Sequence, residues 1–234
     1  MTEEQKKNLF LQIDGLLEIY KNFMPIDNSS FSIEKLKSTY TEMIQFIVDD
    51  TFERENLLSF LSETDFFKAP ASTRFHGDFE SGLSVHTMQV IYQALKFAKP
   101  LLSDFFVSKR QDDFIVSAKD IFVSALSHDF CKVDFYEISF RNTKDVFGNW
   151  VKKAFYKTKD DLRNLGHGNE SVLILLKLMP SMIDNRTVLE AVSRHMGFTD
   201  LTDSEKMNYS NFLQNPLVLL LQLADQSASS WYDY

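Results

Sequence analysis

Apolar residues in the first part of the chain recur at the three- and four-residue spacing of amphipathic helices. Between residues 3 and 23 they stand at Leu9, Phe10, Ile13, Leu16, Leu17 and Tyr20, on one side of a predicted helix. The same spacing predicts a second helix over about residues 32–49 and a short third helix over 54–61. Pro25 is expected to end the first helix, and Asn28, Ser29 and Ser30 offer a cap for the second.

Helical spacing continues through most of the remaining sequence. It predicts helices over residues 82–99, 113–128 and 169–178, with Pro100 ending the first of these. Asn185 can cap a further helix, and Asn215 followed by Pro216 is typical of the start of a last one. The polar residues 199–214 are expected to form a loop with a short helical turn.

The pattern changes to that of strands after Lys132. Residues 135–142 and 150–157 are rich in aromatic and β-branched side chains, and residues 145–149 between them include turn formers. We therefore expect a β-hairpin around residues 135–157, inserted in an otherwise helical chain.

Composition favours a largely helical protein, because 234 residues contain only seven glycines and five prolines. We expect an all-α fold with the small inserted β-hairpin and extra N-terminal helices. Residues 1–69 would form an N-terminal helical scaffold packed on a main domain of residues 70–234. The single cysteine, Cys131, excludes an internal disulfide framework, and no apolar run reaches the roughly 18 residues of a membrane span. The chain is therefore expected to be cytoplasmic.

Charge is spread unevenly along the chain. The whole sequence has 25 Lys and Arg against 33 Asp and Glu, which argues against a protein that coats nucleic acid nonspecifically. Residues 132–163 nevertheless carry 8 basic against 5 acidic side chains. This local excess can meet an anionic substrate, but lysines that guard the edge of a solvated hairpin explain it equally well.

Histidines provide the candidate chemistry. His128 and Asp129 follow the apolar segment 120–126, and neighbouring side chains of a helix point about 100° apart, so both can reach one ion only where the helix ends. Five of the seven glycines lie within four residues of one of the other histidines, which are His76, His86, His167 and His195. Because glycine allows a backbone to come close to a ligand, this clustering indicates a built site.

Three polar residues interrupt apolar faces of the predicted helices, namely His86, His195 and Asp225. A buried carboxylate costs several kcal/mol unless it is paired or bound to a metal. Ligation of a metal explains all three. The structural alternative is that backbone carbonyls satisfy the histidines and that a buried Arg or Ser pairs with Asp225.

The order of these residues resembles that of the HD-domain metal-dependent phosphohydrolase superfamily. The stretch Gly82-Leu-Ser-Val-His86-Thr is similar to the family's Gly-Leu-x-x-His-[Ser/Thr] helix start. His128-Asp-Phe-Cys-Lys132 is similar to its His-Asp-x-x-Lys, and Leu223-Ala-Asp225 to its closing Leu-Ala-Asp. The resemblance covers about residues 70–230. The Gly-Tyr-Pro signature of the HD-GYP proteins is missing after the His-Asp motif, which argues against cyclic di-nucleotide specificity.

The resemblance implies that His86, His128, Asp129 and Asp225 hold one divalent ion. In the binuclear branch of the family, which includes the cyclic-nucleotide phosphodiesterases, two further histidines hold a second ion and the Asp of the His-Asp pair bridges the two. His167 and His195 stand at the matching places. One or two ions are expected, with two favoured, and a histidine-rich set suits Fe, Mn, Zn, Co or Ni.

The implied reaction is attack on a phosphoester by a metal-bridged hydroxide, with Asp129 as the bridging catalytic ligand. Lys132 is expected to neutralise a substrate phosphate, although it could instead be an exposed lysine that complements a helix dipole. Arg74, His76 and Arg141 are weaker candidates for substrate contact. The hairpin, which lies between the metal-binding stretches, is a candidate lid or rim.

Three functions are compatible with these features. The favoured one is a phosphohydrolase or phosphodiesterase that acts on a nucleotide, cyclic nucleotide or nucleic-acid phosphoester, so the expected partner is a small phosphorylated anion. A diiron oxygenase is the alternative, because some HD-domain proteins with a similar binuclear pattern use two irons to activate oxygen. A catalytically silent ligand-binding protein is the third, although all six predicted ligands are present.

Overall fold

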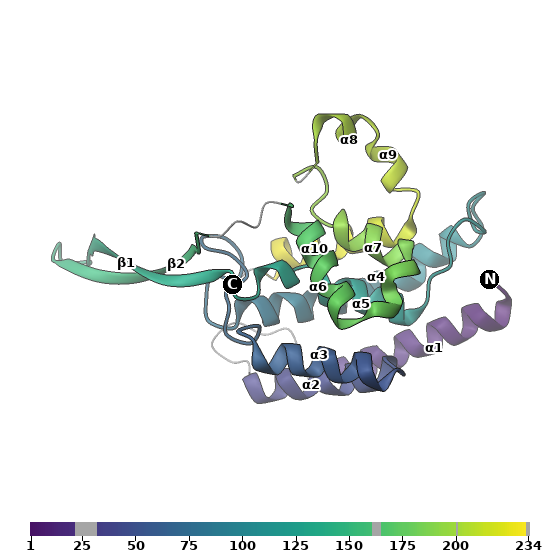
Figure 1. The fold of residues 1–234 in the computed structure, drawn as a ribbon, viewed down its shortest axis with the longest axis horizontal. Coiled ribbons are helices and arrows are strands. Elements are labelled where there is room, and N and C mark those ends of the chain that lie inside the picture. The colour runs from purple at the N-terminus through teal and green to yellow at the C-terminus, as the bar shows by residue number, and fades with distance from the viewer. Residues whose placement is uncertain (22–31, 161–164, 200, 233–234) are drawn as a thin grey trace.

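Two layers of helices lie against each other in the structure, a computed structural model that describes residues 1–21, 32–160, 165–199 and 201–232 (Figure 1). The N-terminal layer consists of α1 (Glu3–Tyr20), α2 (Ile33–Ile47) and α3 (Thr51–Glu63). The second layer consists of α4 (Gly82–Phe105), α5 (Ala118–Ser127), α6 (His167–Leu178), α7 (Arg186–Ser193) and α10 (Pro216–Trp231). The prediction of a mostly helical protein is confirmed.

Short elements connect the long helices. Two 3-10 helices follow α5 and α6, namely η1 (Phe130–Lys132) and η2 (Pro180–Asp184). Two short helices precede α10, namely α8 (Asp203–Met207) and α9 (Tyr209–Phe212). The predicted helical turn within residues 199–214 is thus two short helices, which stand apart from the main body in Figure 1.

The N-terminal helices begin at polar caps. Thr2 forms a capping box with Gln5 at the start of α1, and the Asp50 side chain accepts a hydrogen bond from the Glu53 amide at the start of α3. α1 ends at Tyr20, three residues earlier than predicted. Pro25 and Asn28–Ser30 lie outside the described residues; within them, Ser32 caps α2.

α4 is the central helix of the fold and packs against α1, α5 and α10. The prediction that Pro100 ends this helix is wrong, since α4 continues to Phe105 with Pro100 inside it. A proline within a helix removes one backbone hydrogen bond and costs about 3 kcal/mol. Here the last turn extends the buried face, because Leu102 and Phe106 are both part of the core.

α5 is shorter than predicted. It begins at Ala118 rather than near Asp113, because the Ser117 and Asp120 side chains form a capping box with each other's backbone amides. This cap fixes the first turn of a helix whose described residues are all buried apart from Lys119.

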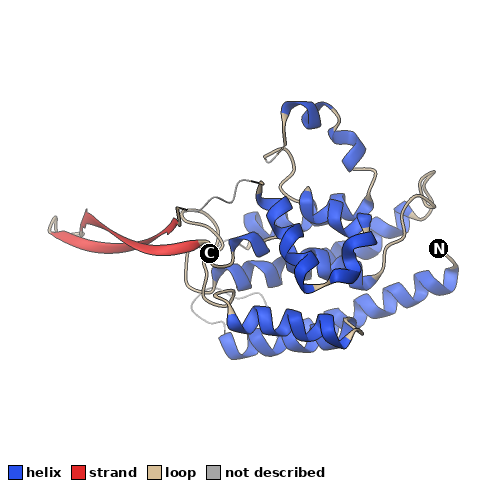
Figure 2. Cartoon of the chain, in the orientation of Figure 1, coloured by secondary structure: helices blue, strands red, loops and turns tan. Residues whose placement is uncertain are grey.

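The predicted hairpin is present as an antiparallel pair, β1 (Tyr136–Lys144) and β2 (Trp150–Thr158). The Asp145 carboxylate closes its turn by accepting hydrogen bonds from the backbone amides of Phe147 and Asn149. These are the only strands among the described residues, and Figure 2 shows them projecting beyond the helices.

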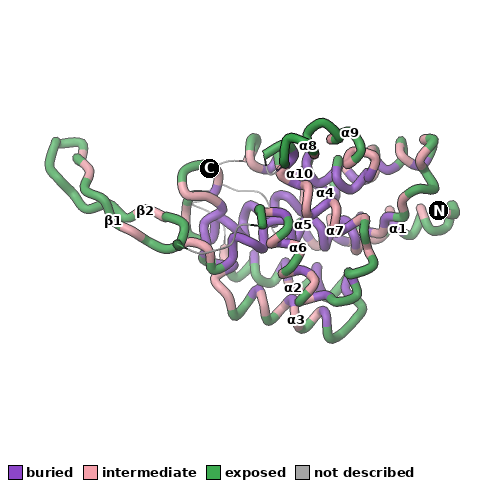
Figure 3. The backbone as a smooth tube through the Cα atoms, turned by 45° about the horizontal axis from the view of Figure 1, so that its top comes forward, coloured by how far each residue is buried: buried purple, intermediate pink, exposed green. Residues whose placement is uncertain are grey.

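One hydrophobic core joins the two layers. Leu36, Tyr40 and Met43 of α2 belong to the same buried cluster as Leu83 and Val90 of α4, so the N-terminal helices do pack on the rest of the chain. The boundary at residue 69 stays a prediction. Figure 3 shows that burial is concentrated in the helical layers, whereas the hairpin and the segment with α8 and α9 are mostly exposed. None of the helices in the described ranges has the length and apolarity needed to cross a membrane.

Candidate metal centre

The His-Asp pair lies at the point where an α-helix changes into a 3-10 helix. α5 ends at Ser127, His128 is its C-cap residue, and Asp129 precedes η1 with φ −111° and ψ 20°. This backbone change turns both side chains toward the same space. The prediction that the helix ends at the pair is confirmed, and both residues are buried.

Three predicted ligands from three helical segments converge into what we call the triad: His86, His128 and Asp225. Their ligand atoms all lie within 4.8 Å of one another. His86 Nε2 is 3.1 Å from Asp225 Oδ1 and 3.4 Å from His128 Nε2. Both histidines are buried, and 17% of the Asp225 side chain is exposed. The triad is thus a buried group that can bind a metal.

Asp129 lies beside the triad and is held by Lys132. Its Oδ2 atom is 2.7 Å from Lys132 Nζ, 3.3 Å from His128 Nε2 and 3.8 Å from His86 Nε2. The alternative that Lys132 is an exposed helix-end lysine is wrong, because this residue is buried. The roles of Asp129 as a ligand and of Lys132 as a phosphate contact stay predictions.

Backbone carbonyls orient two of the histidine rings. His128 Nδ1 is 2.7 Å from the carbonyl oxygen of Ala125, and His195 Nδ1 is 2.7 Å from that of Val192. Since a carbonyl oxygen only accepts hydrogen bonds, each Nδ1 donates a proton and each Nε2 is left to face the cluster. This arrangement is common for histidines that bind metals.

Burial and nearby charge shift the pKa values in the cluster. Burial acts to raise the pKa of Asp129, but the charges of Lys132 and His128 hold it well below its usual range. Burial is likewise outweighed at Asp225, whose pKa is lowered by His86. Burial lowers the pKa of His86, whereas Asp129 outweighs burial and raises that of His128. Both carboxylates are therefore ionised, the state in which they bind cations.

His76 lies against the triad although it is distant from two of its members in sequence. Its ring centroid is 4.6 Å from that of His86, and burial and the neighbouring His86 lower its pKa to about 4. A close backbone contact holds its loop in place, since a Cβ atom on Gly82 would lie 2.0 Å from the carbonyl oxygen of Gly77. Ser81, with φ 73°, makes the turn into α4.

The predicted ligands of a second ion, His167 and His195, lie outside the triad. His195 is buried and its Nε2 atom lies 3.7 Å from Asp129 Oδ1. His167 is half-buried at the first position of α6 and does not belong to the triad. α6 and α7 do approach closely there, because a Cβ atom on Gly168 would lie 2.2 Å from the Ser193 carbonyl oxygen.

The predicted substrate contacts lie at different depths. Arg74 is exposed in the loop before α4, and Arg141 is exposed on β1 with its guanidinium 5.2 Å from the centre of the Phe155 ring. Tyr136, which the sequence did not single out, is the first residue of β1, and burial raises its pKa to about 12. The only feature of the sequence that could have indicated Tyr136 is its position four residues after Lys132.

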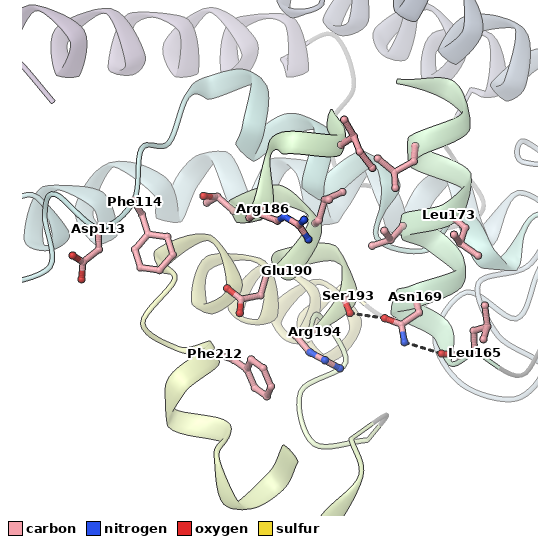
Figure 4. Close-up of a pocket in the computed structure, with 15 residues that line it drawn as sticks. Asp113, Phe114, Leu165, Asn169, Leu173, Arg186, Glu190, Ser193, Arg194 and Phe212 are labelled. Carbon is pink, nitrogen blue, oxygen red and sulfur yellow. Dashed lines mark hydrogen bonds between the residues drawn. The ribbon is translucent and has the colours of Figure 1, made fainter. Parts of the chain in front are cut away.

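A separate groove of about 780 Å³ lies between α6, α7 and α9 (Figure 4). Leucines of α6 and α7 line it together with Arg186, Glu190 and Arg194, and the Ser193 hydroxyl donates to Asn169 Oδ1 at its edge. None of its lining residues is a predicted ligand or substrate contact. The groove is therefore not part of the candidate metal centre.

The residues at the centre fit a metal ion. Two buried atoms, Asp129 Oδ1 and His195 Nε2, have no hydrogen-bond partner among the described residues, and unpaired buried polar atoms are costly. Imidazole nitrogens and carboxylate oxygens are the donors that divalent transition metals prefer.

Comparison of the chain with protein-family models, with curated proteins and with solved structures gives no match.

Proposed function

We propose that this protein is a metal-dependent phosphohydrolase whose active site is the triad with Asp129 and Lys132. The observation that carries the proposal is the convergence of His86, His128 and Asp225, which are far apart in the sequence, to within 4.8 Å of one another. The order and local context of these residues, which resemble the HD-domain motifs, support the same function.

His86 and His128 would supply imidazole nitrogens to the ion and Asp225 a carboxylate oxygen. A divalent ion held there would lower the pKa of a bound water and polarise a phosphoester oxygen. The chain's own contribution is to keep the ligands ionised and oriented. The Ala125 carbonyl fixes the His128 ring, and Asp225 lies within 3.1 Å of His86.

We also propose a second ion beside Asp129, on the basis of two buried atoms. Asp129 Oδ1 and His195 Nε2 face each other at 3.7 Å, and neither has a hydrogen-bond partner in the described part of the chain. An ion between them would satisfy both atoms. His167 would complete this second set if it turns toward Asp129 when metal binds.

Lys132 and His76 would meet the substrate. The buried Lys132 ammonium pairs with Asp129 next to the centre, and it would contact a substrate phosphate once a bound ion neutralises that carboxylate. His76 adds a polar ring at the edge of the triad. A small phosphorylated anion, such as a nucleotide, is the ligand class that this arrangement fits.

Metal content and diester hydrolysis of the same preparations test the proposal. Protein purified without chelator is assayed for bound metals and for hydrolysis of bis(4-nitrophenyl) phosphate, beside His128→Ala and Asp225→Asn. We expect at least one equivalent of Mn, Co, Zn, Ni or Fe in the wild type and loss of both metal and hydrolysis in the two variants. His167→Ala is the matched control, because it removes a histidine outside the triad and should retain at least one equivalent.

Other outcomes would redirect or end the proposal. A fall from two equivalents to one in His167→Ala would assign the second ion to this residue. Two irons together with oxygen consumption, and no diester hydrolysis, would favour the oxygenase alternative. A wild type that binds no metal after reconstitution would contradict the proposed function.

A further inference from the structure

The two strands of the hairpin present an aromatic face. Residues two apart on a strand lie on the same side, and directly paired residues share that side. The register pairs Tyr136 with Thr158, Ile138 with Tyr156, Phe140 with Ala154, Asn142 with Lys152 and Lys144 with Trp150. We call this side the aromatic face; its rings are Tyr136, Phe140, Trp150 and Tyr156.

The rings toward the tip of the aromatic face are exposed. Phe140 is 57% exposed and Trp150 is 70% exposed. The hairpin extends away from the helical layers in Figures 1 and 3, so the helices do not cover it. Exposed large rings in a row are unusual for a surface without a binding role.

The hairpin is basic although the whole chain is acidic. Residues 136–158 carry five Lys or Arg and two Asp or Glu, whereas the chain carries 25 and 33. Glu137 is paired with Lys157 at 2.6 Å. The other four cations, Arg141, Lys144, Lys152 and Lys153, form no ion pair with another described residue.

Two of these cations lie over exposed rings of the aromatic face. Lys144 Nζ is 5.3 Å from the centre of the Trp150 ring, and Lys152 Nζ is 4.9 Å from that of Phe140. Positive charges that alternate with flat rings match a ligand that is both polyanionic and aromatic. Single-stranded nucleic acid has both properties, because its unpaired bases can stack on rings while its phosphates contact lysines.

The aromatic face leads back to the candidate metal centre. Tyr136 is its innermost ring, and Lys132, four residues earlier, contacts Asp129 at 2.7 Å. A hollow of about 380 Å³ lies between the hairpin and the loop that carries His76; its lining includes Ile138 and Tyr156 of the aromatic face and Thr73 and Asp78 of the loop. A strand on the face would thus run toward the His76 side of the triad.

We propose that the aromatic face binds single-stranded nucleic acid and guides it to the metal centre. The guidance rests on the proposed function, whereas the binding does not. Bases would stack on Phe140 and Trp150, and the phosphates would lie beside Lys144 and Lys152. A membrane is the alternative ligand, because Val146 and Phe147 at the tip are exposed as well, but Lys144 and Lys152 at the exposed rings favour the nucleic acid.

Fluorescence anisotropy with a labelled 20-nucleotide RNA tests the binding. Full-length protein is titrated at several salt concentrations, with single-stranded DNA and a duplex of the same sequence as further probes, and a denaturing gel checks that each probe stays intact. We expect single strands to bind at least tenfold more tightly than the duplex. Equal affinity for the duplex, or no binding of single strands at low salt, would overturn the proposal.

Two matched double variants locate the contact. Phe140→Ala with Trp150→Ala should weaken binding by about thirtyfold or more, because the loss of each stacking ring costs about 1–3 kcal/mol. Val146→Ala with Phe147→Ala removes two apolar side chains that are even more exposed, from the turn and outside the aromatic face, and should change affinity less than twofold. The reverse ranking would overturn the proposal. Circular dichroism checks that both variants fold.

Charge and membrane controls complete the test. Lys144→Gln with Lys152→Gln should reduce the slope of log affinity against log salt by about 1.4, since each phosphate contact on a single strand contributes about 0.7. An unchanged slope would overturn the placement of the phosphates.

Flotation with phosphatidylserine vesicles tests the membrane alternative. Vesicle binding that depends on Val146 and Phe147, without oligonucleotide binding, would overturn the proposal.

Failure of this inference can be distinguished from failure of the proposed function. Hydrolysis of bis(4-nitrophenyl) phosphate reports on the metal centre alone, because this small diester does not extend to Phe140 or Trp150. A protein that binds single strands through the aromatic face but cleaves no diester retains this inference and loses the proposed function. A protein that cleaves the diester but binds no single strand does the opposite.

Discussion

Lys132 Nζ lies 2.7 Å from Asp129 Oδ2, and both side chains are buried at the two ends of η1, which follows Asp129 and ends at Lys132. Lys132 therefore balances the negative charge of the carboxylate while Asp129 Oδ1 remains available on the side of His195. Burial and the charge of Asp129 act in opposite directions on Lys132, and the net effect raises the pKa of its ammonium.

Replacing Lys132 with methionine should destabilise the metal-free protein, because it removes the lysine that pairs with the buried Asp129 carboxylate. Loss of one partner of a buried ion pair typically costs about 3–5 kcal/mol. Urea unfolding in the presence of a chelator measures the change. Adding Asp129→Asn to this variant should recover much of the loss, since the buried charge is then removed.

Lys99→Met is the matched control for this prediction. Lys99 pairs with Asp14 at 2.6 Å, but the side chains are 37% and 56% exposed, and exposed pairs contribute at most about 1 kcal/mol. Equal losses of stability in Lys132→Met and Lys99→Met would contradict the burial of the Lys132–Asp129 pair.

Metal binding should stabilise the fold. A ligand at 100 times its dissociation constant adds about 2.7 kcal/mol to the free energy of unfolding, which for a chain of this size raises Tm by about 5–10 °C. Thermal unfolding with and without added Mn, Co or Zn measures the shift. Asp225→Asn should abolish it, whereas Asp184→Asn, which changes an exposed carboxylate outside the cluster, should retain it. An undiminished shift in Asp225→Asn would exclude Asp225 as a ligand.

Gly82→Ala should destabilise the protein and displace the loop that carries His76. The added Cβ atom would lie 2.0 Å from the Gly77 carbonyl oxygen, a backbone atom, so we expect a loss of about 1–3 kcal/mol. Gly15→Ala is the control, because its Cβ meets only the exposed Phe46 side chain at 2.5 Å. That ring can move, and alanine is the better helix former, so this variant should be neutral or up to about 1 kcal/mol more stable. Chemical denaturation of both variants tests the difference.

Pro100→Ala should stabilise the protein by about 1–2 kcal/mol, because an alanine amide can restore the hydrogen bond that proline removes inside α4. Part of the gain is offset, since proline also restricts the unfolded chain. Pro216→Ala should act in the opposite direction, because proline fits the first position of α10. Urea unfolding of both variants compares them. A loss of stability in Pro100→Ala would contradict a continuous α4.

Local signals in the sequence predicted much of the fold. The apolar stripe of α1, the Asn215-Pro216 start of α10 and the hairpin with its turn at Asp145 each depend on residues close together in the chain. The same holds for the end of α5 at the His-Asp pair. The gathering of His86, His128 and Asp225 joins distant segments, and it was anticipated from the resemblance to the HD-domain motifs.

Packing between distant segments was not predictable in the same way. Pro100 was expected to end its helix, and only the burial of Leu102 against other elements explains why it does not. A sequence motif could not show whether Lys132 is buried or exposed, because its burial depends on the segments that pack around η1. The contact of His76 with His86 likewise requires the backbone contact of Gly77 with Gly82.

The base of the hairpin has a consequence for how its length can vary. Lys159 donates its backbone N–H to the Phe135 carbonyl oxygen, so the two ends of the insertion lie side by side. Adding or removing a pair of residues in each strand would therefore lengthen or shorten the ribbon by a whole pleat without disturbing η1. A change of one residue in a single strand would turn its outer side chains to the opposite surface. We therefore expect related chains that keep Trp150 and Phe140 on one face of the hairpin to differ in strand length by an even number of residues.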